Sequence, residues 1–321
     1  MWPAGAATCP GGVGKPAWPE IALSDITQAP EWFQRALEHE ASAHEVEVDG
    51  CRIHYRLWGE SAAPPLLLIH GGGAHTHWWD FIAPLLARDY RVGAFDLSGM
   101  GDSGRRDHYE FEIYARETVA VCEAAGFDER AVLVGHSLGG AVALLAVHHH
   151  PERFGALITA DSPVRPPGFR FPGGGRNPLS RERKRYPDRE TILGRFRVMP
   201  EQPCANGYIL EHIARHSIVE LDDGWSWKFD DRIAESLTMG HLTEPFSQVR
   251  IPKAVIYGGL SALFPAEVLT HMRNLAAHRA AFVEIPDAHH HLFLDQPIAF
   301  VSAVRAVLEG WRLAPGTRLF G

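Results

Sequence analysis

Short apolar runs alternate with stretches of helical periodicity over much of the chain. The apolar runs lie at 66–69, 92–95, 132–134 and 156–160. Continuous runs of this kind are typical of strands that are buried on both faces. Helical patterns lie between and after them, over 78–87, 111–125 and 138–149. Strands that alternate with helices predict a mostly parallel sheet covered by helices on both faces.

The first 43 residues have a different pattern. Residues 1–20 are rich in Gly and Pro, lack a basic start followed by an apolar run, and are expected to form a mobile tail rather than a signal peptide. An alternative is that this segment packs on the body through Trp2 and Trp18. Helical spacing after Pro30 predicts a short helix over 31–40. Alternation on both sides of Asp49-Gly50 then predicts a β-hairpin, which would form the antiparallel edge of the sheet.

The strand and helix alternation stops after Asp161 and resumes at Ala254. From there we expect a strand at 254–257, a helix at 265–275, a strand at 282–285 and a helix at 297–308. Residues 163–245 begin with several prolines and then resemble short helices, so we interpret them as a cap (lid) inserted after the sixth strand. The predicted core is therefore 44–162 with 246–321. The cap would cover the carboxyl ends of the strands, where open α/β sheets bind ligands.

Composition limits the classes of protein to consider. The 321 residues carry a net charge of −8, which gives no reason to expect a nucleic acid partner. The four cysteines are far apart and favour a cytoplasmic location. No apolar stretch approaches the roughly 18 residues of a membrane span, and no phosphate-binding glycine loop indicates a cofactor. The oligomeric state is not predictable from the sequence.

A candidate nucleophile lies in Gly135-His136-Ser137-Leu138-Gly139, which matches G-x-S-x-G. The motif falls directly between a predicted strand and a predicted helix, the context in which a sharp turn exposes a strained serine. The helix that starts at Leu138 would direct its free N–H groups and positive dipole end at the same point.

Four motifs in a fixed order resemble the α/β-hydrolase superfamily over residues 44–162 and 246–312. They are His70-Gly71-Gly72, the segment from Phe95 to Ser103, Gly135 to Gly140, and His290 followed by Asp295 and Pro297. The resemblance implies the α/β-hydrolase fold, in the serine hydrolase branch with a cap, and the superfamily's reactions. It also implies an oxyanion hole formed by the backbone N–H groups of Gly72 and Leu138.

The resemblance also implies a general base and an acid. In the family the base lies on the loop after the last strand, five residues before an acidic residue and seven before a proline, which indicates His290. The usual acid position after 254–257 has no Asp or Glu before Glu267. Some members carry the acid about two dozen residues past the nucleophile, and this position is Asp161 here. The alternative is that Asp161 only caps the turn into the insertion.

The sequence indicates substrate-binding residues less specifically than it indicates the catalytic ones. Trp78, Trp79, Phe264 and Trp225 are candidates for an apolar pocket, although aromatic side chains are more often part of the core. Between Arg165 and Arg197 the chain has ten basic and three acidic residues. This excess either steers a carboxylate- or phosphate-bearing substrate to the cap or forms a solvated face. Of the histidine-rich segments, 289–291 is not expected to bind a metal, and no metal site is predicted.

The pattern therefore predicts a serine hydrolase that cleaves a small-molecule carboxylic ester, thioester or lactone through an acyl-enzyme on Ser137. A carbon–carbon bond hydrolase or an acyltransferase would use the same triad. Ser137 argues against dehalogenase and epoxide hydrolase chemistry, which normally use an aspartate nucleophile. A third alternative is a non-catalytic, small-molecule-binding member of the fold, favoured by the missing acid after Tyr257.

Overall fold

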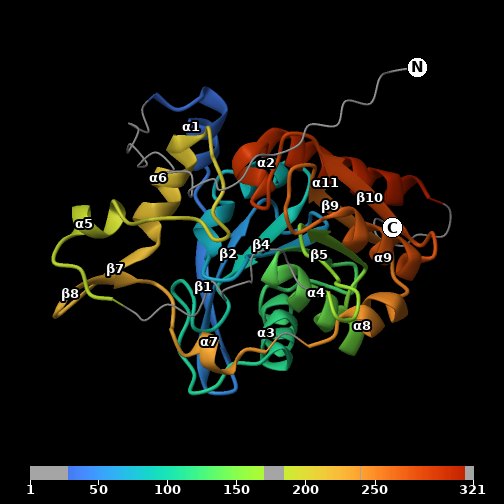
Figure 1. Ribbon diagram of the computed structural model, residues 1–321, viewed down its shortest axis with the longest axis horizontal. Coiled ribbons are helices and arrows are strands. Elements are labelled where there is room, and N and C mark those ends of the chain that lie inside the picture. Colours follow the sequence, from blue (N-terminus) through green and yellow to red (C-terminus); the bar gives the residue numbers. More distant parts are fainter. Residues whose placement is uncertain (1–27, 170–183, 239, 315–321) are drawn as a thin grey trace, which may run out of the picture.

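The computed structural model describes residues 28–169, 184–238 and 240–314. An eight-stranded sheet with the order β1-β2-β4-β3-β5-β6-β9-β10 runs through its centre (Figure 1). Strand β2 is antiparallel to both of its neighbours, and all the other neighbouring pairs are parallel. The strands are β1 (Ser42–Val48), β2 (Cys51–Trp58), β3 (Pro65–Ile69), β4 (Arg91–Phe95), β5 (Val132–His136), β6 (Ala156–Ala160), β9 (Lys253–Gly258) and β10 (Ala280–Ile285). This is the predicted mostly parallel sheet with an antiparallel edge.

The edge hairpin has the predicted two-residue turn. Val48 pairs with Cys51, and both Asp49 and Gly50 between them have positive φ values of 48° and 72°. A two-residue turn of this type requires positive φ at both positions, which Asp and Gly tolerate better than other residues.

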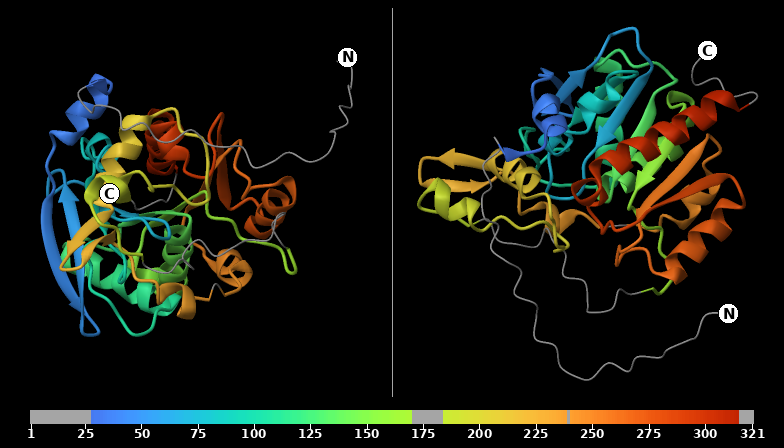
Figure 2. Two further views of the ribbon diagram at one scale, coloured as in Figure 1. Left: turned by 60° about the vertical axis from the view of Figure 1, so that its left-hand side comes forward. Right: turned by 90° about the horizontal axis from the view of Figure 1, so that it is seen from above.

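Helices cover both faces of the sheet (Figures 1 and 2). Each face has its own hydrophobic core. Within β3, Leu66 and Leu68 belong to one core, and Leu67 and Ile69 belong to the other. Successive side chains of a strand point to opposite faces of the sheet, so a strand between two cores is apolar at every position. This explains the continuous apolar runs in the sequence. The helices of the first core include α1 (Glu31–Leu37), η2 (Thr76–Trp79), α2 (Ala83–Leu86), α10 (Leu292–Asp295) and α11 (Pro297–Leu313), and those of the second include α3 (Phe111–Ala124), α4 (Leu138–His149), α8 (Thr243–Gln248) and α9 (Ala266–Ala276).

The helix expected over 78–87 is wrong in its extent. The structure has a short 3₁₀ helix, η2, and a separate turn of α-helix, α2, which has Pro84 in its first turn. Proline has no N–H and clashes with the preceding turn, so it is accepted at the start of a helix but not in its interior. A continuous helix through Pro84 is therefore disfavoured.

The segment between β6 and β9 contains a hairpin in addition to the expected short helices. Its strands β7 (Ile218–Leu221) and β8 (Gly224–Trp227) pair as antiparallel neighbours. Within its described residues, the helices of the segment are α5 (Arg189–Leu193), α6 (Gly207–His216), α7 (Ile233–Ser236) and, before β9, α8. Figures 1 and 2 show that α5 and the β7–β8 hairpin project from one side of the molecule, whereas α6 lies against the body. Residues 170–183 of the predicted cap and the predicted tail over 1–20 lie outside the described residues.

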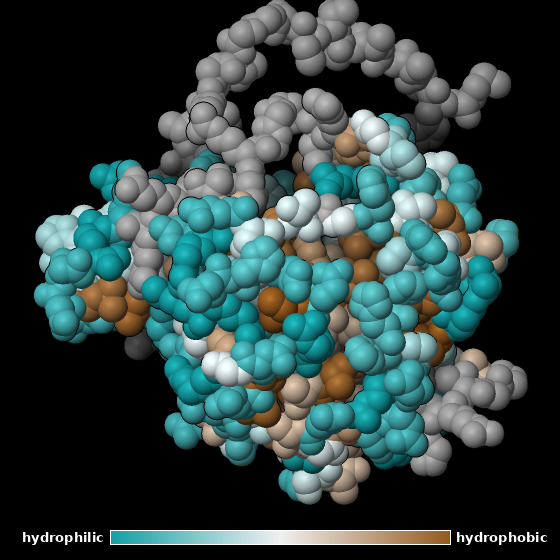
Figure 3. Space-filling model, turned by 90° about the horizontal axis from the view of Figure 1, so that it is seen from below, coloured by the Kyte–Doolittle hydropathy of each residue, from teal (hydrophilic) through white to brown (hydrophobic). Residues whose placement is uncertain are grey.

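Polar side chains dominate the face shown in Figure 3, where hydrophobic atoms form small, separate patches. Among the described residues the large hydrophobic side chains that are exposed are Leu260, Ile298 and Leu313. In the same part of the chain, no helix has the length and apolar character needed to cross a bilayer.

Candidate active site

The candidate nucleophile lies at a strained turn between β5 and α4. Ser137 has φ 53° and ψ −118°, which is unusual for a residue with a Cβ atom. The turn is tight enough that a Cβ on Gly135 would lie 2.2 Å from the Gly139 oxygen, and one on Gly139 would lie 2.4 Å from the His70 oxygen. Glycine is therefore required on both sides of Ser137, as the motif predicts.

Three candidate catalytic side chains meet at the carboxyl ends of the strands. His290 Nε2 lies 3.0 Å from Ser137 Oγ, and His290 Nδ1 lies 2.8 Å from Asp161 Oδ1. Ser137 follows β5, Asp161 follows β6, and His290 is on the loop between β10 and α10. Asp161 is fully buried and His290 is 3% exposed. The geometry is that of a serine, imidazole and carboxylate relay.

Asp161 is held by three hydrogen bonds. Besides accepting from His290 Nδ1, it accepts from the Gly258 N–H at 2.9 Å and from Ser261 Oγ at 2.7 Å. These donors satisfy both carboxylate oxygens in a site that excludes water. Ser261 was not predicted as a site residue, although it lies in the segment noted for its missing acid. There it donates to the carboxylate supplied by β6.

His136 packs beside the relay. Its ring lies 4.8 Å from that of His290, and its Nε2 lies 3.1 Å from the His290 carbonyl oxygen. A carbonyl only accepts, so Nε2 carries the proton and donates it. Burial, followed by the proximity of His290, lowers the pKa of His136 well below its usual value. The ring is therefore neutral and supports the loop that carries His290.

The two predicted oxyanion-hole donors lie beside Ser137. Gly72 lines the cavity described below, and Leu138 is the first residue of α4. In the described part of the chain, neither the Gly72 N–H nor the Leu138 N–H donates to a protein acceptor. Two free backbone N–H groups near the nucleophile are what an oxyanion requires.

A cavity of about 470 Å³ opens over Ser137 and His290. The core contributes Gly71 to His75, Trp78, His136 and His291, and the segment between β6 and β9 contributes Lys184, Tyr186, Arg195 to Met199, Ser217 and Trp227 to Phe229. The volume is in the range of small-molecule sites. Of the four aromatic residues predicted to bind substrate, Trp78 lines this cavity.

The other three aromatic residues, Trp79, Phe264 and Trp225, do not line the cavity, so their prediction is corrected. Trp79 is fully buried against Phe293, with ring centroids 4.8 Å apart. Phe264 stacks on Tyr257 within the second core. Trp225 lies beside the turn of the projecting hairpin, and Trp227, two residues closer to the body, takes a place in the cavity wall.

The cavity wall is positively charged. Among the residues that the structure describes, Lys184, Arg195, Arg197 and Lys228 line it, and no carboxylate does so. Lys228 pairs with Asp102 at 2.6 Å. Within the described ranges, none of the other three cations forms an ion pair, and Arg197 donates only to the backbone oxygens of Gly194 and Phe196. Of the ten basic residues counted in the sequence, six lie among the described residues, and three of these six line the cavity.

Comparisons with known proteins agree with this fold. The family model described as the alpha/beta hydrolase fold matches residues 64–186. A pimeloyl-[acyl-carrier protein] methyl ester esterase from Neisseria meningitidis is 28% identical, over 78% of this chain and 95% of that protein. A serine hydrolase-like protein from Danio rerio is 25% identical, over 84% of this chain and 89% of that protein.

A solved structure has the same fold. The thioesterase domain from the curacin biosynthetic pathway superposes with a TM-score of 0.69 at 22% identity, over 83% of this chain and 99% of that domain. The chain has the alpha/beta hydrolase fold. Its similarity to proteins named as esterases supports hydrolase activity.

Proposed function

We propose that this protein cleaves a carboxylic ester or thioester through an acyl-enzyme on Ser137. The observation that carries the proposal is the continuous relay from Ser137 Oγ through His290 to buried Asp161, at 3.0 and 2.8 Å. Similar chains named as methyl ester esterases also favour ester cleavage.

Each residue of the relay has a defined chemical role. Ser137 Oγ attacks the acyl carbonyl carbon while His290 Nε2 takes the hydroxyl proton. His290 then donates that proton to the leaving oxygen or sulfur, which departs as the alcohol or thiol and leaves the acyl group on Ser137. Water, deprotonated by His290, releases the acid. Asp161 keeps the Nδ1 proton on His290 and stabilises the imidazolium that forms in each half-reaction.

The negative charge that develops on the substrate oxygen is stabilised by the N–H groups of Gly72 and Leu138. These groups are fixed by the glycine loop after β3 and by the start of α4. Donors that are already oriented need no reorganisation during the reaction, which is why one such hydrogen bond is worth about 3 kcal/mol in the transition state.

Turnover of a p-nitrophenyl ester tests this proposal. The wild type should show a burst of p-nitrophenol equal to the enzyme concentration if deacylation is slower than acylation. Ser137→Ala should lower kcat by about 10⁴-fold or more. Undiminished turnover by a folded Ser137→Ala variant would refute the proposal. The burst, if present, also distinguishes an acyl-enzyme from direct attack by water.

The preferred substrate carries a negative charge on its acyl part. Lys184, Arg195 and Arg197 line the cavity, and no carboxylate is among its lining residues in the described ranges. Cations of this kind attract an anionic substrate and orient its charged end away from Ser137. The p-nitrophenyl monoester of glutarate and p-nitrophenyl pentanoate have acyl chains of equal length and differ in charge, so they isolate this preference.

The glutarate ester should have the higher kcat/KM, by about tenfold, equivalent to ~1.4 kcal/mol. Arg195→Gln with Arg197→Gln should remove most of this preference through KM, and added salt should weaken it. Arg189→Gln is the matched control, because Arg189 is exposed in the same segment and does not line the cavity. An equal preference in the double variant would contradict the role of these arginines.

The structure bears differently on the two alternative functions, the related enzymes and the non-catalytic binding protein. A carbon–carbon bond hydrolase or an acyltransferase uses the same relay and is distinguished by substrate: a 1,3-diketone cleaved faster than any ester would favour the former. The non-catalytic alternative rested on the missing acid after β9, and Asp161 in contact with His290 removes that argument. A cytoplasmic location stays a prediction from the cysteine pattern.

A further inference from the structure

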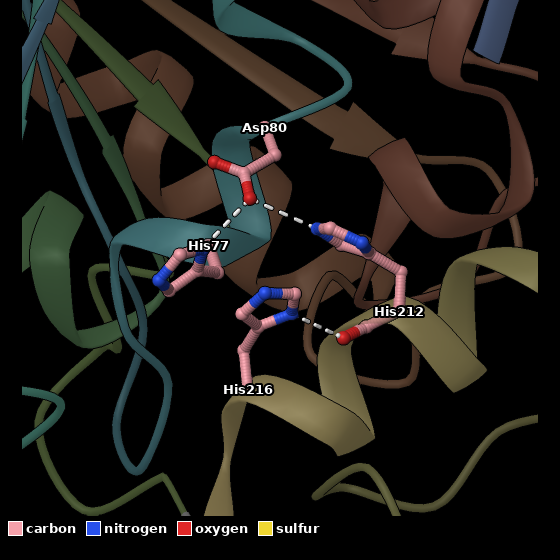
Figure 4. Close-up of side chains that lie close together, drawn as sticks. All are labelled: His77, Asp80, His212 and His216. Atoms are coloured by element: carbon pink, nitrogen blue, oxygen red, sulfur yellow. Dashed lines mark hydrogen bonds and ion pairs between the residues drawn. The ribbon is translucent and has the colours of Figure 1, made fainter. Parts of the chain in front are cut away.

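A second group of histidines lies behind the cavity wall, between the core and α6. His77 and Asp80 come from η2 and the residue that follows it, and His212 and His216 come from α6. Figure 4 shows that the three imidazoles and the carboxylate point toward one another from these two elements. We refer to these four residues as the histidine–aspartate cluster.

The contacts converge on one carboxylate oxygen. Asp80 Oδ2 lies 2.7 Å from His77 Nδ1 and 2.9 Å from His212 Nε2. The Nδ1 of His216 donates to the His212 carbonyl oxygen at 2.8 Å, which leaves its Nε2 without a proton. In Figure 4 this Nε2 faces the space enclosed by the other three groups. One ligand atom from each of the four residues lies within 4.8 Å of the others.

The donor set is that of a transition-metal site. Three imidazole nitrogens and one carboxylate oxygen suit Zn²⁺, whereas Mg²⁺ and Ca²⁺ prefer oxygen ligands. Histidines four residues apart, such as 212 and 216, lie on the same face of a helix. The four ligand atoms lie within 4.8 Å of one another. Small side-chain rotations would place each of them roughly 2.0–2.1 Å from a single zinc ion with tetrahedral geometry.

Neighbouring groups hold the ligands as metal sites require. The Arg56 guanidinium pairs with Asp80 Oδ1, so it occupies the oxygen that does not face the cluster. The His212 carbonyl fixes the tautomer of His216. Partners of this kind orient the ligands and are part of most metal sites. The positive charge of Arg56, with a nitrogen 3.2 Å from His77 Nδ1, opposes a cation and limits its affinity.

We propose that the histidine–aspartate cluster binds one Zn²⁺ ion that clamps α6 to the core. The clamp would act on the cavity wall, because Ser217 follows His216 and His75 lies two residues before His77. The Nε2 of His75 lies 2.8 Å from Ser217 Oγ, and both residues line the cavity. A metal that bridges their neighbours would fix this contact. The proposal is independent of the reaction at Ser137.

Two other groups of histidines could take up zinc. His148 and His149 lie at the end of α4, and His136, His290 and His291 lie beside the candidate nucleophile. Zinc on the latter group would occupy His290 and inhibit ester turnover. The competing structure of the histidine–aspartate cluster is a metal-free network in which Asp80 simply accepts from two imidazoles and Arg56. Each of these possibilities gives a different result in the experiment below.

The experiment is a zinc titration of untagged, EDTA-treated protein at neutral pH against a chromogenic chelator. We expect one tight site per chain, and His212→Gln with His216→Gln should lower its affinity by at least about 100-fold. The matched control is His148→Gln with His149→Gln, which changes two histidines at another helix end and should keep the site. X-ray absorption should show three nitrogen ligands and one oxygen at roughly 2.0–2.1 Å.

Thermal unfolding gives a second readout. Zinc that binds only the folded state raises Tm, in the wild type and the control but not in the double variant. If the double variant does not fold, His77→Gln alone should lower the affinity by a similar factor, because His77 is partly exposed. The proposal is overturned if the wild type has no tight zinc site, or if the control variant loses zinc affinity as much as the double variant does. It is also overturned if zinc inhibits turnover and His290→Gln abolishes zinc binding.

Discussion

Asp161 and Asp80 are two buried carboxylates that meet histidines in different ways. Asp161 contacts one imidazole, and its other bonds come from a backbone N–H and a serine hydroxyl. Asp80 contacts two imidazoles on one oxygen and a guanidinium on the other. The far nitrogen of His290 faces Ser137, whereas the free nitrogen of His216 faces back into its own cluster (Figure 4).

This difference separates two uses of the same residue types. A single imidazole between a carboxylate and a hydroxyl transfers a proton along one line. Several imidazoles whose lone pairs converge provide a cage for a cation. Residue identity is therefore not enough to tell the two apart, and the direction of each ring nitrogen decides. Substitutions of Asp161 and of Asp80 test the two uses separately. Smaller effects are expected for Ser261 and for the buried histidines.

Asp161→Asn should lower kcat for ester hydrolysis by about 10⁴-fold, because the amide favours the wrong tautomer of His290. Zinc affinity should stay as in the wild type. Asp287→Asn is the control, since Asp287 is an exposed carboxylate three residues before His290 with φ 55°, a conformation that Asn accepts. Steady-state kinetics measure both variants. An Asp161→Asn enzyme as active as the control would refute the acid assignment.

Asp80→Asn should lower zinc affinity by at least about 100-fold. It should also lower the free energy of unfolding by on the order of 3 kcal/mol, because the partly buried Arg56 guanidinium loses its carboxylate. Denaturant unfolding of the metal-free protein measures the second effect. Asp89→Asn removes the carboxylate of an exposed pair with Arg305 and should cost under about 1 kcal/mol. Equal losses in both variants would mean that the two pairs are equivalent.

Ser261→Ala should lower kcat by about tenfold and leave KM unchanged. The change removes one charge-assisted hydrogen bond to Asp161, worth roughly 1.5–3 kcal/mol, while the Gly258 N–H and His290 still hold the carboxylate. Ser261→Thr keeps the hydroxyl and should restore most of the rate. Steady-state kinetics give kcat and KM separately. A rise in KM alone would assign Ser261 to substrate binding instead.

Lowering the pH should destabilise the fold through buried neutral histidines. Burial lowers the pKa of His70 and, to a larger extent, of His136 below the usual 6.5. The Leu97 N–H donates to His70 Nε2 at 3.1 Å, so protonation there would also break a hydrogen bond. The stability that these rings confer is complete above their usual pKa and is lost as the pH falls toward their lower folded-state values, because the unfolded chain then binds more protons.

Unfolding free energies measured from about pH 7.5 down to pH 5 test this dependence, with a slope of up to ~1.4 kcal/mol per pH unit for each ring. His136→Gln should reduce the slope, and His149→Gln, at an exposed position, should leave it unchanged. A profile that is identical in all three proteins would show that His136 is not involved.

Much of the fold was predictable because its central strands are buried on both faces. Continuous apolar runs such as Leu66–Ile69 have few alternatives, and the Asp49-Gly50 turn has specific chemistry. The G-x-S-x-G motif indicated Ser137, and the family resemblance implied His290 and Asp161; the structure brings the three into contact. The helix expected over 78–87 was predicted from its periodicity alone, although Pro84 within it already indicated a break.

Other features depend on contacts that spacing does not encode. Trp79 and Phe264 have the composition of pocket residues, but packing places them in the two cores. The hydroxyl of Ser261 gains its role only where β6 and β9 lie side by side. In the histidine–aspartate cluster, Asp80 and His212 are 132 positions apart in the chain. Within the sequence the site shows only as two local pairs, His77 with Asp80 and His212 with His216, and nothing in their spacing connects one pair to the other.

The most direct test of the central claim is covalent labelling with a fluorophosphonate, followed by peptide mass spectrometry, on the wild type and on Asp161→Asn. The account predicts that the wild type is labelled at Ser137 alone and that Asp161→Asn is labelled far more slowly. Folded wild-type protein that is not labelled at Ser137, or is labelled equally fast in Asp161→Asn, would contradict the relay of Ser137, His290 and Asp161.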